Sequence, residues 1–365
     1  MQLSFFPSRT ITVYLAKLFL ARIAAMLAIL VLVLMMLDLL GTSGTILAVE
    51  GNGQAEVLRY VGLRVPQLVA TFLPYSVLLA TVLTLLTLNQ NSEIVAMKAS
   101  GMSAHQVLAP LFLTAGIVSI GSFAFNERVV TRATETLKAW QGAEYGPIPQ
   151  EAGARSNVYF TDGTNVMTAT AMAGEGTGIV MRGITFYNRT AQGTLTSQIT
   201  AERATWANPG WRLDNAELFD VAAAKTTPIP SPVVGAGLTI EQIELDSVDA
   251  DAQGFFELRQ SIDAYERVGR RTSELEAKWW HKLSGPLAAM LMPLLGAVAA
   301  FGLARSGQLF VRALIAMALG FAYFVVDNAA LAMGSFGGYP PLLAAWAPFV
   351  LFALIGETVL VRTEE

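Results

Sequence analysis

The chain has 365 residues, of which 53% are hydrophobic and 14% are charged, whereas roughly 25% of the residues in an ordinary soluble domain are charged. This deficit of charge indicates an integral membrane protein. The net charge of −4 gives no reason to expect nucleic acid as a partner, and the absence of cysteine excludes disulfides, thiol catalysis and cysteine metal sites.

The first 145 residues contain three apolar segments, at Ile23 to Leu40, Val65 to Leu88 and Val107 to Phe125. A bilayer span needs roughly 20 apolar residues, and each segment is close to that length. The first one is too long for a signal-peptide core and lacks a small-residue cleavage site, so we expect it to be retained. A polar helix continues from the third segment as far as Lys138. Residues 1–145 are therefore predicted to hold transmembrane helices 1 to 3.

The pattern changes at residues 146–252, where no run is long enough to cross a bilayer. Apolar residues such as Ile184 and Phe186 alternate there with more polar neighbours, and turn residues such as those at 208–210 separate the segments. Period-two alternation with such turns is typical of strands with one buried face. We predict an all-β jelly roll or sandwich of roughly one hundred residues, inserted between two membrane halves.

Residues 253–365 are predicted to hold connecting helices and three more spans, at Leu283 to Ala304, Leu309 to Met333 and Pro341 to about Val361. A pair of tryptophans just before the first of these is typical of a membrane interface. The predicted fold class is a membrane α-helical protein with six transmembrane helices, three on each side of an inserted extracytoplasmic β-jelly-roll domain.

The orientation follows from the lysine and arginine residues in the short connections, which concentrate on the cytoplasmic side. With the N-terminus inside, the inner connections hold Arg9, Lys17, Arg22, Lys98, Arg305, Arg312 and Arg362, and the outer ones hold Arg59 and Arg64. The excess of seven basic residues in the inner connections over two in the outer ones predicts cytoplasmic N- and C-termini. It places the β domain outside the cytoplasm.

A polar element at about residues 91–101 separates the second and third spans. Asn91 or Ser92 can cap a short helix that starts at Glu93, Gly101 can end it, and Ser103 can cap the next helix. The orientation above places this element in the cytoplasm.

Two kinds of residue make this element a candidate docking surface. Small residues such as Ala96 and Ala99 allow another protein to approach closely, while Glu93, Met97 and Lys98 offer charges and a flexible apolar side chain. Such an element can carry force from a cytoplasmic partner into the membrane. The alternative is an ordinary solvated turn between two helices.

Arg128, Arg132 and Lys138 lie on the polar helix that follows the third span. Basic groups at the level of lipid headgroups suit anionic phosphates, because arginine can hold two oxygens at once. The alternative is a solvated helix whose charge is balanced by Glu127 and Glu135.

Asp38 and Asp327 are intramembrane carboxylates near the outer ends of their helices, and such groups raise a functional hypothesis by default. The alternative is an interfacial position or a hydrogen-bonded contact between helices. His105 and His281, the two histidines, are far apart in sequence and on opposite predicted faces of the membrane, so no zinc site is expected.

Three segments together resemble the LptF/LptG (YjgP/YjgQ) family of lipopolysaccharide export permeases, and the likeness covers nearly the whole chain. They run from Tyr60 to Ala80, from Ser92 to Ser103 and from Gly338 to Pro348. The second and third segments look more like the LptG branch of the family than the LptF branch.

The resemblance implies a heterodimer with an LptF-like subunit in the inner membrane of a Gram-negative bacterium. It also implies two copies of an LptB-like ATPase on the cytoplasmic side and an LptC-like partner for the β domain. ATP would be bound by the ATPase, so no cofactor is expected in this chain.

The resemblance also implies roles for particular residues. The segment at 91–101 looks like the family's coupling helix, whose matching residues here are Glu93, Ile94, Met97, Lys98 and Gly101, with Glu93 facing a basic groove of the ATPase. By position and charge, Arg128, Arg132 and Lys138 are the nearest match to the family's basic residues that contact lipid A phosphates. The segment from Met35 to Asp38 carries no lysine, although relatives can have one there, which leaves the phosphate-binding role of that helix open.

The predicted function is that of a permease subunit of an ATP-driven exporter. It would extract lipopolysaccharide from the inner membrane and pass it to a periplasmic bridge. The chain is expected to be a transport subunit and not an enzyme. The alternatives are a scaffold that transmits force without transport, and a lipid-modifying enzyme in which Asp38 and Asp327 would face each other.

Overall fold

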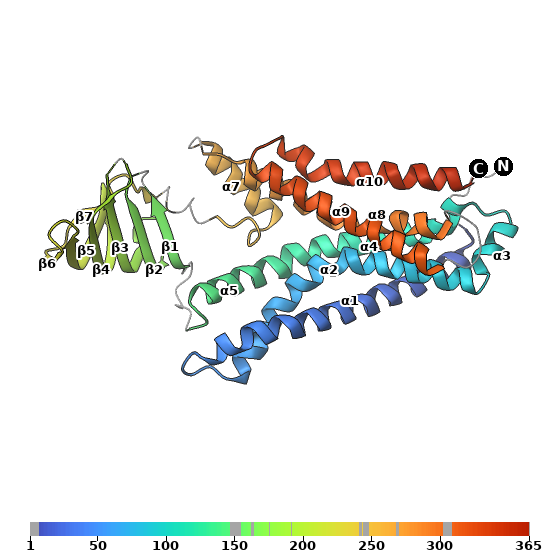
Figure 1. Cartoon of the computed structure of the whole chain (residues 1–365), viewed down its shortest axis with the longest axis horizontal. Helices are drawn as coiled ribbons and strands as arrows, with labels where there is room; N and C mark the ends of the chain where they lie inside the picture. The colour runs from blue at the N-terminus through green and yellow to red at the C-terminus, as the bar shows by residue number, and fades with distance from the viewer. Residues whose placement is uncertain are drawn as a thin grey trace. The chain divides into compact units, whose positions relative to one another are not determined.

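The computed structural model describes residues 7–146, 155–161, 164–174, 176–190, 192–240, 243, 248–267, 270–301 and 309–364. Arg305, used above for the orientation, lies outside the described residues, as do residues 147–154 of the predicted β domain. The chain divides into two compact units (Figure 1). The helical unit comprises Met1–Gly41, Val61–Thr134 and Ala250–Glu365, and the second unit, which contains the β-strands, comprises Thr42–Tyr60 and Glu135–Asp249.

Long helices account for most of the residues on both sides of the β-strands. Before the strands, the helical elements are α1 (Arg9–Leu47), α2 (Gln54–Gln90), α3 (Glu93–Ala99), α4 (Ala104–Phe125), the π-helical turn η1 (Asn126–Val130) and α5 (Thr131–Gly142). After the strands, they are α7 (Phe255–Arg267), α8 (Ser273–Phe301), α9 (Leu309–Ser335) and α10 (Pro341–Glu364).

Among the described residues, five helices are long and apolar enough to cross a bilayer. They are Arg9–Leu47, Gln54–Gln90, Ala104–Gly142, Leu314–Ser335 and Pro341–Arg362. The expectation of a helical membrane protein is therefore confirmed. The predicted span from Leu283 to Ala304 coincides with α8, whose described part ends at Phe301. The sixth span stays a prediction.

The core of the helical unit lies where α8 packs against α4, α9 and α10 (Figure 1). Ala288, Met292 and Leu295 of α8 are buried in the same cluster as Leu108 and Leu111 of α4. In a bilayer these contacts act through close van der Waals packing, because lipid tails are as apolar as the side chains themselves.

Two glycines allow helices of this unit to approach each other closely. A Cβ atom at Gly320 of α9 would overlap Cδ2 of Leu78, and one at Gly356 of α10 would lie 2.7 Å from Cγ of Leu294. Any side chain at either position would push these leucines away. Small residues at helix crossings are the usual means of association in membranes.

The second unit is built around one antiparallel sheet (Figure 1). Its strands are β1 (Arg155–Thr161), β2 (Val166–Ala173), β3 (Val180–Arg189), β4 (Leu195–Ala207), β5 (Gly210–Asp220), β6 (Lys225–Ile229) and β7 (Val233–Val234). The predicted alternation is confirmed, because Ile184 and Phe186 are buried and pair in register with Ala201 and Ile199 of β4. Trp211 is also fully buried, and its Nε1–H donates to the carbonyl of Leu238 at 3.0 Å.

The order of the strands differs from the expected topology. The strands β1 to β6 lie next to one another in chain order, and β7 pairs with β5. A jelly roll needs two Greek keys, in which neighbouring strands are not consecutive. The β domain is therefore confirmed, whereas the described strands do not confirm a jelly roll. Alternation along a strand reports which face is buried and carries no information on which strand lies beside it.

Candidate functional site

The short helix α3 begins at Glu93, as the sequence predicts, but its expected cap is absent. Ser92 has a left-handed backbone (φ 59°), and its side chain makes no capping hydrogen bond. The Asn91 side chain instead donates to Glu93 Oε1 at 3.3 Å. The prediction that Asn91 or Ser92 caps the helix is wrong, because a cap needs an extended backbone at the residue before the helix.

The end of α3 and the start of the next helix are as predicted. Gly101 has a positive φ of 87°, and its N–H bonds to the carbonyl of Lys98 at 3.0 Å. The N–H of Met102 bonds to the carbonyl of Met97 at 3.2 Å, which completes a Schellman motif. Ser103 then forms a reciprocal capping box with Gln106 at the start of α4. These two features together define the junction between α3 and α4.

The two faces of α3 differ in character. Ile94 is buried in the core of the helical unit, and the half-buried Met97 packs against the same core. On the other face, Val95 is 60% exposed, and exposed small residues surround it. These are Ala96, Ala99, Ser100 and Gly101, with the exposed Lys98 among them. The outward face therefore consists of small exposed residues with one larger apolar side chain and one positively charged side chain.

Glu93 contacts a neighbouring helix of its own chain. The hydroxyl of Tyr14, in α1, donates to the Glu93 carboxylate at 3.2 Å and 3.4 Å to its two oxygens. The resemblance implied a carboxylate facing a partner, whereas the structure shows a half-buried carboxylate with donors from α1 and from Asn91. Sequence reasoning missed Tyr14, because a tyrosine near the start of an apolar segment ordinarily indicates only an aromatic side chain at the membrane interface.

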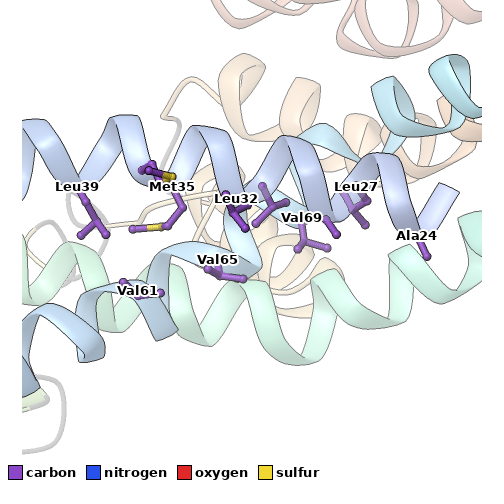
Figure 2. A pocket seen from close by; sticks show the side chains of 11 residues that line it. Ala24, Leu27, Leu32, Met35, Leu39, Val61, Val65 and Val69 are labelled. Carbon is purple, nitrogen blue, oxygen red and sulfur yellow. The ribbon is translucent and has the colours of Figure 1, made fainter. Parts of the chain in front are cut away.

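An apolar groove of about 490 Å³ lies between α1 and α2. Its lining residues lie between Ala24 and Leu39 on α1, together with Val61, Val65 and Val69 on α2, and Figure 2 shows side chains from both helices directed into it. All of these residues are apolar, so the groove suits hydrocarbon.

A polar network lies beside this groove. Arg64 of α2 forms an ion pair with Asp38 of α1 at 3.2 Å and donates to Gln67 at 2.7 Å, and Gln67 donates to Thr134 at 3.2 Å. Asp38 is thus engaged in a hydrogen-bonded contact between helices, the alternative named above. Sequence reasoning assigned Arg64 no functional role. It was counted only as one of two basic residues in the outer connections when the membrane orientation was predicted.

The three candidate phosphate-binding residues fall into separate parts of the structure. Arg128, in the π-helical turn, and Arg132 are exposed and belong to the helical unit. Lys138 belongs to the second unit, where it forms an ion pair with Asp249. The neighbouring Glu127 accepts the N–H of Phe255 at 2.8 Å with each carboxylate oxygen and so caps the start of α7.

The second intramembrane carboxylate has a different partner from the first. Asp327 of α9 is only 6% exposed, and its Oδ2 lies 3.0 Å from Nε2 of His281 in α8. Its Oδ1 has no hydrogen-bond partner among the described residues. Asp38 and Asp327 therefore do not face each other, and no cluster of potential metal ligands occurs in the described part of the chain.

Long apolar helices, an inserted antiparallel β unit and a short exposed helix between two of the spans define a multi-pass membrane protein with a β insert. Comparison with known families makes this class specific. The model of the lipopolysaccharide export system permease LptF/LptG family matches residues 13–362, and the chain belongs to that family.

Individual relatives agree with this assignment. The chain is 26% identical over 321 residues to the lipopolysaccharide export system permease protein LptG of Escherichia coli strain K12, covering 86% of this chain and 88% of the relative. It is 23% identical over 337 residues to the LptG protein of Haemophilus influenzae, covering 88% and 92%. The resemblance drawn from the sequence is thus confirmed, including the likeness to LptG.

Proposed function

We propose that this chain is one of two permease subunits of an ATP-driven lipopolysaccharide exporter. In this proposal it lies in the inner membrane with both termini in the cytoplasm, α8 provides the sixth span, and an LptF-like subunit completes the heterodimer. The β unit lies in the periplasm, where it passes the lipid to a bridge through an LptC-like partner. Membership of the permease family supports this function.

The observation that carries the proposal is the apolar groove beside α1. Lipopolysaccharide is a large amphiphile. Exposing its acyl chains to water costs about 0.8 kcal/mol of free energy for each CH₂ group. Extraction therefore needs both a hydrocarbon-lined surface and a source of work. The groove offers the first, and an LptB-like ATPase dimer that binds ATP and docks on α3 offers the second.

The charged residues near the groove have a matching role in this proposal. Arg64 lies beside the groove and would bind a lipid A phosphate in competition with Asp38, because guanidinium groups bind phosphate oxygens in pairs. Arg128, Arg132 and Lys138 would hold phosphates further along the route. The structure does not support the alternative of a lipid-modifying enzyme, because Asp38 and Asp327 each pair with a different residue.

An Ala28→Trp variant tests the proposal, because Ala28 lines the groove and is exposed. An indole there would exclude at least two methylenes of a bound lipid, at about 0.8 kcal/mol each, and we expect roughly tenfold slower ATP-dependent release of lipopolysaccharide. The measurement is lipid release from vesicles containing the complete complex.

The matched control is Ile117→Trp, at a position of α4 that is 64% exposed and does not line the groove. Its lipid release should equal that of the unmodified protein. Equal release from the Ala28→Trp variant would show that the groove does not hold the lipid and would contradict the proposal.

A further inference from the structure

The packing of α1 is uneven along its length. Near its N-terminus, Leu15, Phe19 and Ile23 are almost completely buried (0%, 0% and 3% exposed). Beyond Ile23 exposed side chains such as Leu32 (60%) and Leu40 (81%) alternate with buried ones such as Met35 (6%). Of the five candidate spans, α1 has the lowest buried fraction. The helix is therefore packed most completely near its N-terminus, and the part beyond lines the apolar groove and is tied to α2 by the ion pair of Asp38 with Arg64.

The N-terminal third of α1 is the part that contacts α3. Ile94 of α3 belongs to the same buried cluster as Leu15 and Phe19. The direct link between the two helices is the hydroxyl of Tyr14, which donates to the Glu93 carboxylate. A hydrogen bond of this kind resists separation of the two helices at this point.

A displacement at Tyr14 can reach the groove because α1 is a single continuous helix. It contains no proline, whereas α2 contains Pro66 and Pro74, and sharp kinks arise mostly at proline. At a rise of 1.5 Å per residue, Met35 in the groove wall lies about 32 Å along the helix from Tyr14. A tilt imposed at the N-terminal third therefore moves the wall of the groove.

We propose that Tyr14 is a positioning residue that joins α3 to α1, so that movement of α3 by the docked ATPase changes the width of the groove. This inference rests on the function proposed above, and it assigns Glu93 a role directed into its own chain. The hydrogen bond between Tyr14 and Glu93 transmits the pull of the ATPase, while the outward face of α3 provides the docking surface.

A Tyr14→Phe variant tests this, because it removes the hydroxyl and keeps the ring. In vesicles containing the complete complex, we expect ATPase association and the rate of ATP hydrolysis to stay at the level of the unmodified protein. The amount of lipopolysaccharide released per ATP hydrolysed should fall roughly tenfold, equivalent to about 1.4 kcal/mol of coupling. The control is Tyr339→Phe, which removes a hydroxyl that donates to the carbonyl of Ala330 in α9, and it should leave all three quantities unchanged.

A double-mutant cycle identifies the partner of the hydroxyl. If Tyr14 acts through Glu93, adding Tyr14→Phe to Glu93→Ala should lower the release per ATP no further than Glu93→Ala alone. Additive losses would overturn the proposal, as would unchanged release per ATP in the single Tyr14→Phe variant. A loss of ATPase association in that variant would also overturn it, because the hydroxyl would then belong to the docking surface. Failure of the proposed function has a different signature, namely the absence of ATP-dependent release from the unmodified complex.

Discussion

Replacing His281 by leucine is expected to destabilise the helical unit more than an ordinary core substitution. The imidazole is the partner of Asp327, which is 6% exposed, and the second carboxylate oxygen already lacks a partner among the described residues. Leucine would leave the whole carboxylate unpaired between α8 and α9. Breaking a fully buried pair costs about 3–5 kcal/mol, and because His281 is about one third exposed, we expect a cost near the lower end of that range. We expect a clear drop in the thermal unfolding midpoint of the protein in detergent.

Two further variants separate the pair from simple loss of packing. Asp327→Leu leaves His281 behind, but this side chain is about one third exposed and can be solvated, so the loss should be smaller. The double variant His281→Leu with Asp327→Leu removes both polar groups and should recover most of the stability, because replacing a whole buried pair by apolar residues is often neutral. A double variant less stable than His281→Leu alone would show that Asp327 stabilises the protein through contacts other than His281 and would contradict this explanation.

The sequence predicted the elements of this fold better than the contacts between them. The length of the apolar runs located the long helices, period-two alternation located the strands, and the residue types at Gly101 and Ser103 predicted how α3 ends and α4 begins. These features depend on neighbours within a few positions. The pairs Arg64 with Asp38 and His281 with Asp327 join residues 26 and 46 positions apart. Side-chain partners at such separations follow from helix packing, which no local pattern reports.

At the candidate site, too, the sequence predicted local features but not contacts between distant residues. The exposed and buried faces of α3 follow from the spacing of Ile94, Val95 and Met97, and the small residues correctly indicated an accessible surface. The direction of Glu93 could not be predicted, because it depends on the position of Tyr14 in a helix 79 residues away. The left-handed backbone at Ser92 was also unexpected, since serine adopts it less readily than glycine or asparagine.

The arrangement around α3 explains why one short helix can have two separate functions. Ile94 is buried in the core and Glu93 is hydrogen-bonded to Tyr14 of α1, while the Schellman ending of α3 and the capping box of α4 define the junction between these two helices. The fold therefore does not depend on the exposed face of α3. A substitution there should change partner binding without changing the fold, whereas a substitution on the buried face should change both.

A Val95→Asp variant is accordingly expected to insert and fold normally but to lose its ATPase partner. Val95 is 60% exposed, so the carboxylate is solvated in the isolated chain, whereas docking of the ATPase would bury it without a matching cation. A buried charge left without a partner costs several kcal/mol, and about 3 kcal/mol corresponds to roughly a hundredfold weaker binding. The measurement is co-purification of the ATPase with the membrane subunits.

The matched control is Val221→Asp, at an exposed turn of the β unit, which should retain the ATPase. Retention by the Val95→Asp variant as well would place the docking surface elsewhere and remove the support for α3 as the point where the work of ATP hydrolysis enters the membrane.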